Sequence, residues 1–282
     1  MCIRDRPRSL RWQILLEPAK DTKLQRIYPV VVIGYMANNL LPFRIGELVR
    51  SYYLFQKEKI SLSVGLATVL IERIFDANTL ILFLLIGLNF LPSENFFITE
   101  LDSHIWWWGL FKILISVGFI VSSSIILFIS IYPDKSEQLS RRFSIFLPNF
   151  IRSRAMELIV SGIRAMQQLR SLSKLFYIIS LSIIIWVLEI AVFYIVAMAF
   201  GFLELYPEYF KMAMLMGVLT AVANIVSSVP AVPGGIGMFE LVSRELLLLF
   251  KGMNLTRPLA VSYTHLRAHE TLRYLVCRLL LE

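Results

Sequence analysis

Long apolar blocks constrain the fold of this chain more than any other feature of its sequence. Residues 105–132 and 175–203 carry one charged side chain each, Lys112 and Glu189, and residues 62–91 form a third long block. A helix crosses the hydrocarbon core of a bilayer with about 20 apolar residues, whereas a barrel strand needs only about 9–11. Because lipid leaves helices and closed barrels as the only spanning structures, the sequence predicts an all-α, polytopic integral membrane protein.

The charges between these blocks predict an orientation. Residues 133–174 contain eight Lys and Arg and three acidic residues, whereas residues 92–104 contain three acidic residues and no Lys or Arg. The positive-inside rule therefore puts residues 133–174 in the cytoplasm of a multi-pass plasma-membrane protein. The net charge of +8 then indicates loops that face anionic lipid rather than a nucleic-acid partner. Residues 145–170 have the spacing of an amphipathic helix, which could lie on the cytoplasmic leaflet or pack on the protein's own cytoplasmic end.

Two apolar segments are interrupted by helix-breaking residues. Residues 38–50 read NNLLPFRIGELVR, and residues 224–244 repeat the order Asn, Pro, Ile-Gly, Glu-Leu-Val, Arg with a gap. Proline removes a backbone donor and clashes with a continuing helix, so we expect re-entrant hairpins over about 27–56 and 207–250. With three spans between them, the hairpins would enter from opposite faces, as in inverted-repeat transporters. Chance similarity between two Pro- and Gly-rich breaks is the alternative.

Charged side chains in the apolar segments need a physical account. They are Glu47, Arg50, Glu72, Arg73, Asp76, Glu189, Glu240 and Arg244. A lone charge at the bilayer centre costs at least about 2.5–3.5 kcal/mol on insertion scales, so these groups should be paired or wetted. They either converge on a polar cavity or form ion pairs that tie helices together.

The two ends of the chain differ from the rest. Residues 1–6 and 262–282 resemble translated sequencing adapter, so we expect the genuine chain to span about 7–261, although both could be real termini. The two cysteines, Cys2 and Cys277, lie in these end segments. We therefore expect no disulfide or thiol chemistry.

Three motifs resemble a known family. NNLLPFRIGELVR, IERIFD and VPAVPGGIGMFE, in that order, are similar to the flippase-like transmembrane domain of the lysylphosphatidylglycerol synthase family. That resemblance, together with the position of Arg244, gives these candidate substrate-binding or translocation residues: Asn39, Pro42, Arg44, Gly46, Glu47, Arg50, Glu72, Arg73, Asp76, Pro233, Gly234, Gly235, Gly237, Glu240 and Arg244.

The resemblance implies a bacterial cell-membrane protein that moves a phospholipid or aminoacyl-phospholipid between leaflets. Its arginines could hold a lipid phosphate bidentately, and its carboxylates could balance them or meet a cationic headgroup. We expect no cofactor, no metal and no catalytic residue, because neither an aminoacyl-transferase motif nor a clustered set of metal ligands is visible. The alternatives are an intramembrane enzyme acting on lipid-linked phosphate, and a membrane subunit that docks a separate lipid synthase through residues 133–174.

Overall fold

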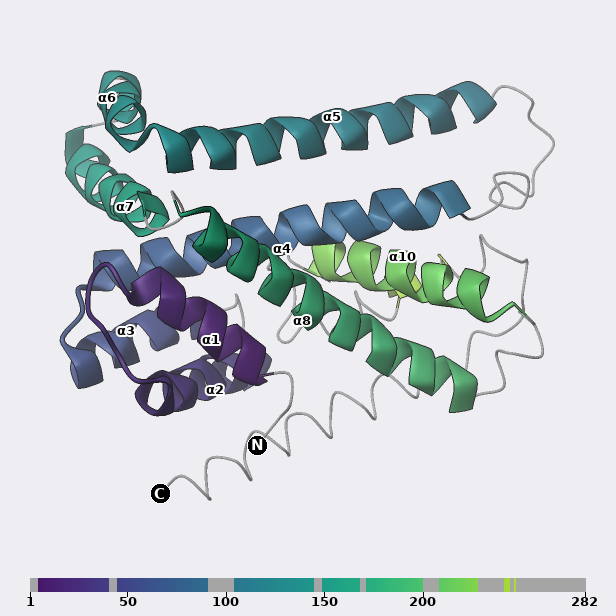
Figure 1. Cartoon of the computed structure of the whole chain (residues 1–282), viewed down its shortest axis with the longest axis horizontal. Helices are drawn as coiled ribbons and strands as arrows, with labels where there is room; N and C mark the ends of the chain where they lie inside the picture. The colour runs from purple at the N-terminus through teal and green to yellow at the C-terminus, as the bar shows by residue number, and fades with distance from the viewer. Residues whose placement is uncertain are drawn as a thin grey trace.

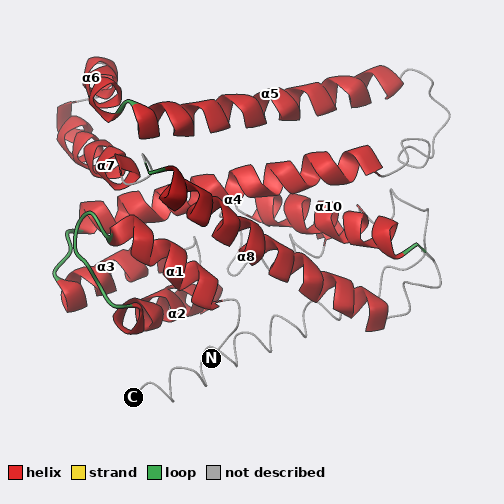
Figure 2. Cartoon of the chain, in the orientation of Figure 1, coloured by secondary structure: helices red, strands yellow, loops and turns green. Residues whose placement is uncertain are grey.

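The computed structural model describes residues 5–40, 45–90, 104–144, 149–167, 171–199 and 208–227, together with 241–243 and 246. Regular secondary structure in these stretches is helical throughout, and none of them contains a strand (Figure 2). The predicted all-α class is therefore confirmed.

The three predicted spans are three long helices. They are α4 (Leu62–Phe90), α5 (His104–Ile131) and α8 (Leu172–Ala199). A fourth long helix, α10, covers Tyr209–Ser227. Three helical segments among the described residues are long and apolar enough to cross a membrane. They are Lys112–Ile131 of α5, all of α8, and Tyr209–Val226 of α10. α4 has 29 residues and is long enough as well, although its first half carries three charged side chains.

The first predicted hairpin is a pair of helices that pack along each other. α2 (Leu24–Leu40) and α3 (Gly46–Glu58) are in contact, and residues 41–44, where the sequence predicts the break, lie outside the described residues. α3 ends in a left-handed cap, because Lys59 has φ 58° and its N–H donates to the Phe55 carbonyl at 3.1 Å. Whether this pair dips into the bilayer and returns is not tested by the arrangement, so its re-entrant character stays a prediction.

The second predicted hairpin is only partly described. α10 supplies its first arm, and its 19 residues match the length of a full span of about 20. Residues 228–240, which include the predicted break, lie outside the described residues. Re-entry and the inverted repeat therefore stay predictions.

The basic segment folds as two helices, α6 (Pro133–Phe143) and α7 (Asn149–Gln167). Ala165 and Met166 of α7 are buried in a cluster with Leu15, Phe75 and Ile178 of other helices. Of the two positions that the sequence left open for residues 145–170, the structure therefore shows α7 packed on the protein itself. Its outer side keeps exposed Arg154 and Arg164.

α4 is the spine of the molecule (Figure 1). Near its N-terminal end it packs with α3 and with α1 (Asp5–Leu16), where Trp12, Leu54 and Val69 share one apolar cluster. Further along, Leu84 and Leu88 pack against Leu219 of α10 in a second cluster. α5 lies along only part of α4, and just 11% of its membrane-length segment is buried. With the cluster around Phe75 described above, α4 contributes to three buried clusters, whereas α5 is mostly uncovered.

A close glycine contact holds α2 against α3. A methyl group added to Gly46 would collide with the carbonyl oxygen of Gly34 and would lie 2.6 Å from the backbone nitrogen of Asn38. Both obstacles are backbone atoms, which cannot rotate away. Glycine at position 46 is thus required by the approach of the two helices.

We predict that Gly46→Ala destabilises the folded protein by about 1–3 kcal/mol, the usual cost of overpacking. Thermal unfolding of the detergent-solubilised full chain would measure it as a lower midpoint. Gly118→Ala on α5 is the matched control, because an added methyl there meets nothing within 4 Å. A midpoint for Gly46→Ala equal to that of Gly118→Ala would contradict this packing.

Candidate functional site

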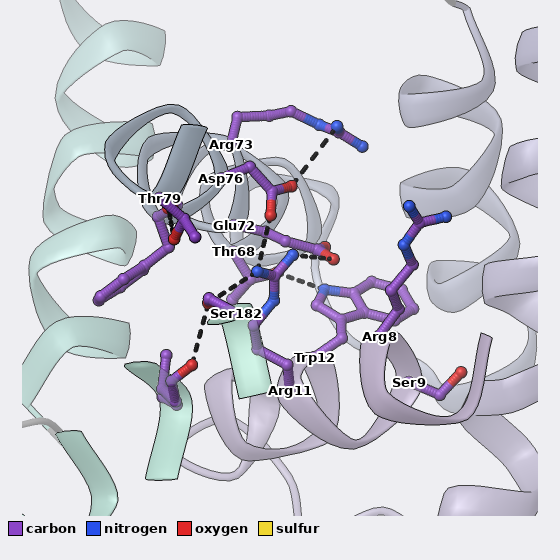
Figure 3. Close-up of polar contacts among 12 residues, drawn as sticks. Arg8, Ser9, Arg11, Trp12, Thr68, Glu72, Arg73, Asp76, Thr79 and Ser182 are labelled. Atoms are coloured by element: carbon purple, nitrogen blue, oxygen red, sulfur yellow. Dashed lines mark hydrogen bonds and ion pairs between the residues drawn. The ribbon is translucent and has the colours of Figure 1, made fainter. Parts of the chain in front are cut away.

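A buried arginine from the first helix lies at the centre of a charge network. Arg11 on α1 is fully buried and donates from Nη1 to Asp76 Oδ1 at 2.7 Å and to Ser182 Oγ at 2.9 Å. Its Nη2 donates to Glu72 Oε1 at 3.0 Å (Figure 3). One guanidinium thus ties α1 to α4 and α8. Burial by itself lowers the pKa of Arg11, but attraction to Asp76 and Glu72 outweighs it and raises that pKa, so Arg11 stays charged.

A second arginine reaches the same carboxylate from α3. Arg50 is buried, and its Nη1 lies 2.8 Å from Glu72 Oε2. The Arg50 guanidinium also lies over the Trp12 ring, 3.6 Å from its centroid, which is a cation–π contact. The indole Nε1 of Trp12 in turn donates to Thr68 Oγ1 at 3.1 Å. Glu72 is therefore held between two guanidinium groups in a pocket that includes an aromatic wall.

The third arginine lies at a more open rim. Arg73 Nε is 3.0 Å from Glu47 Oε1, and Arg73 Nη1 is 3.6 Å from Asp76 Oδ2. The Arg73 and Glu47 side chains are 31% and 30% exposed, whereas Glu72 is fully buried. Asp76 links rim and centre, because its Oδ1 accepts from Arg11 and also from Trp186 Nε1 at 3.1 Å.

The network is electrically balanced. Arg11, Arg50 and Arg73 face an equal number of carboxylates, those of Glu47, Glu72 and Asp76. Such pairing offsets the large cost of removing charges from water. A phosphate that binds Arg73 must therefore compete with Glu47 for that guanidinium. We call these six side chains the charge network.

Some donors in the network have no acceptor among the described residues. The buried Arg50 Nε and Nη2 atoms have no hydrogen-bond partner there. A buried donor without a partner costs about 1–3 kcal/mol of stability. These charged N–H donors form their strongest hydrogen bonds with anions such as phosphate or carboxylate. Across the described stretches, no group of three His, Cys, Asp or Glu side chains is arranged to hold a metal ion.

A separate ion pair lies close to the network. Glu189 on α8 is 3.5 Å from Arg8 on α1, and the Arg8 guanidinium lies 4.8 Å from the centroid of the Tyr35 ring. The isolated acidic residue of the apolar block 175–203 is thus paired by the first helix.

The structure brings together one part of the predicted site. Five predicted residues meet in the charge network: Glu47, Arg50, Glu72, Arg73 and Asp76. Gly46 lies at the helix contact described above, and Asn39 is in the last turn of α2, with its side chain outside the described set. The remaining predicted residues lie outside the described residues: Pro42, Arg44, Pro233, Gly234, Gly235, Gly237, Glu240 and Arg244. A meeting of the two hairpins at one pocket is thus untested.

Sequence reasoning missed the residues that complete the network, namely Arg11, Trp12, Ser182 and Trp186. A charge count offered one signal, because Glu47, Glu72 and Asp76 outnumber Arg50 and Arg73 by one. A second signal was the spacing of Ser182 and Trp186, which lie four apart within an apolar block and so share a helix face. Neither pattern identifies Arg11 as the missing cation, since only folding brings α1 to α4.

Residues 8–268 match the family model described as the lysylphosphatidylglycerol synthase TM region. One relative is a UPF0104 membrane protein from Methanothermobacter thermautotrophicus, 28% identical over 82% of this chain and 68% of its own length. Another, from Methanocaldococcus jannaschii, is 26% identical over 72% of this chain and 75% of its own. Both relatives are archaeal, so the expected bacterial source stays a prediction. No solved structure matches the chain.

We predict that Arg11→Gln destabilises the protein by about 3–5 kcal/mol, because it leaves Glu72 and Asp76 buried without their main cation. Equilibrium or thermal unfolding of the full chain would measure the loss. The control is Arg141→Gln, which removes an exposed pair with Glu137 at 2.7 Å and should cost no more than about 0.5 kcal/mol. Equal small losses in the two variants would show that Arg11 does not hold the network together.

Proposed function

This chain belongs to the lysylphosphatidylglycerol synthase transmembrane family, and from that premise we propose that it moves phospholipid or aminoacyl-phospholipid between membrane leaflets. The observation that supports the proposal most is the charge network, a buried polar cluster that continues to a partly exposed ion pair within a bundle of apolar helices. Flippase-like translocation needs polar partners inside the bundle, because a charged headgroup in hydrocarbon without them is costly.

The rim pair is the proposed point of headgroup entry. Arg73 and Glu47 are the most exposed members of the network, at 31% and 30%. A lipid phosphate can bind the Arg73 guanidinium bidentately and replace Glu47 as its partner. The displaced Glu47 carboxylate is then able to pair with an ammonium group of an aminoacyl or similar headgroup. With a headgroup that carries both a phosphate and an ammonium group, charge is balanced before and after this exchange.

The buried centre of the network supports the rim. Asp76 accepts from Arg11 and Trp186 while it contacts Arg73, so its position is fixed from three helices. Arg50 carries donors that have no hydrogen-bond partner among the described residues, and these are the next group available to a phosphate moving inward. In this proposal Arg11 and Glu72 maintain geometry, and Glu47, Arg73 and Arg50 contact the headgroup.

The second predicted hairpin completes the path in this proposal. Glu240 and Arg244 would approach from the opposite face, and Arg44 would lie at the mouth of the first hairpin. Residues 133–174 would lie in the cytoplasm beneath a plasma membrane, so that the rim pair meets lipid of the inner leaflet first.

The test is translocation of fluorescently labelled aminoacyl-phosphatidylglycerol, whose headgroup carries both a phosphate and an ammonium group, by the full chain in sealed vesicles, followed with an impermeant quencher. Arg73→Gln and Glu47→Gln should each slow translocation about tenfold or more, because a charge-assisted hydrogen bond contributes about 1.5–3 kcal/mol and 1.4 kcal/mol is a factor of about ten. Folding of each variant is checked by its thermal midpoint.

The matched control is Lys174→Gln. It removes a half-exposed ion pair with Glu17 at 2.7 Å, outside the charge network, and should leave the rate unchanged. Wild-type protein no faster than empty vesicles would contradict translocation of this lipid. A folded Arg73→Gln variant with the wild-type rate would contradict the role given to the rim.

A further inference from the structure

A groove separates α5 from the rest of the bundle. It has a volume of about 180 Å³ and lies between α4, α5 and α8. Its walls are mainly apolar side chains, among them Phe75 and Leu82 of α4, Phe119 and Leu127 of α5, and Ile179 and Ile183 of α8. The charge network does not include any of these side chains.

The groove is open to the surroundings along its side. Leu127, Ile179 and Ile183 line it and are nevertheless 45%, 40% and 37% exposed. At one end it is closed, because Phe75 also belongs to the buried cluster that contains Met166 of α7. A chain-like apolar group can therefore enter from the side but cannot pass beneath α7.

A small polar contact joins α5 to α4 at the groove. Ser122 Oγ donates to Asn78 Oδ1 at 2.7 Å, and Ser123 Oγ lies 3.5 Å from the same oxygen. Asn78 and Ser123 also line the groove, whose other walls are mainly apolar. This contact therefore fixes the two helices to each other at one point of the groove.

The chain's position in a membrane limits what can fill such a space. The walls come from three long apolar helices, two of which, α5 and α8, meet the length and composition of a span. Hydrocarbon of the bilayer is therefore the medium at the groove's open side. The closed end is bordered by α7, on which exposed Arg164 lies two residues before Met166, a member of the same buried cluster as Phe75. An anionic headgroup beside this cation would be attracted to it, as is usual for basic residues at a membrane surface.

From these observations we propose that the groove between α4, α5 and α8 is a binding site for one acyl chain of an anionic phospholipid. The lipid comes from the leaflet that borders α7, and its headgroup lies beside Arg164 of that helix. This site goes beyond the translocation proposal, because it can be occupied by a resident lipid whether or not the charge network moves headgroups.

The experiment is photolabelling of the full chain in bilayer discs with phosphatidylglycerol that carries a diazirine in mid-chain. Labelled residues are mapped by mass spectrometry. We expect labels concentrated on groove residues such as Phe119, Leu127 and Ile179. Phosphatidylcholine with the same labelled chain should label these residues less, because its headgroup has no net negative charge.

Neighbouring residues give matched variants. Ser123→Trp and Ile183→Trp place an indole in the groove and should abolish groove labelling. Ser124→Trp and Ile184→Trp put the same group on an adjacent exposed position that does not line the groove, and should leave labelling intact. Thermal midpoints within a few degrees of wild type for all four variants would show that they fold.

Three results would overturn the proposal. Labels spread evenly over the exposed faces of α5 and α8, unchanged by Ser123→Trp, would indicate bulk lipid only. Equal labelling by phosphatidylcholine would show that the groove does not select an anionic headgroup, which contradicts the proposal. Protein-to-protein crosslinks from groove residues to a second copy of the chain would identify that copy as the occupant. None of these results depends on whether translocation is observed.

Discussion

One buried guanidinium, that of Arg11, organises the polar interior of this protein. It satisfies Glu72, Asp76 and Ser182 at 2.7–3.0 Å and so joins α1, α4 and α8 through charge-assisted hydrogen bonds. Carboxylates on a helix as apolar as α4 would otherwise face a large desolvation cost. The arrangement of Arg50 and Trp12 around Glu72, and of Trp186 around Asp76, extends this pairing outward to the rim.

The same helix, α4, contributes to both proposed lipid contacts, the charge network and the groove. α4 turns Glu72 and Asp76 toward α1, and turns Phe75, Asn78 and Leu82 toward the groove beside α5. Glu72 and Asp76, four apart, form one stripe along the helix, and Phe75, Asn78 and Leu82 form a neighbouring stripe. Polar and apolar portions of a lipid could thus meet different faces of one spine. α8 repeats the arrangement, with Ser182 and Trp186 on one stripe and Ile179 and Ile183 on the neighbouring one.

Sequence reasoning predicted the long helices well because a bilayer imposes a length on them. Blocks 62–91, 105–132 and 175–203 differ from α4, α5 and α8 by only a few residues at either end. It also predicted that charges in IERIFD would need partners, and it named Arg50 among the candidates. Arg11 could not be found in this way, since its carboxylate partners lie 61 and 65 residues away along the chain. The surface against which α7 packs could not be predicted from helical periodicity either, because the same pattern of apolar residues suits packing against lipid and packing against protein.

The balance of charge within the network has an electrical consequence. A membrane potential does work of about 2.3 kcal/mol per 100 mV on each elementary charge that crosses it. The six paired groups sum to zero, so a rigid displacement of the whole set along the membrane normal involves no net work against the field. Voltage would then act on the cargo alone: a zwitterionic headgroup would cross without electrical work, and an anionic one would not.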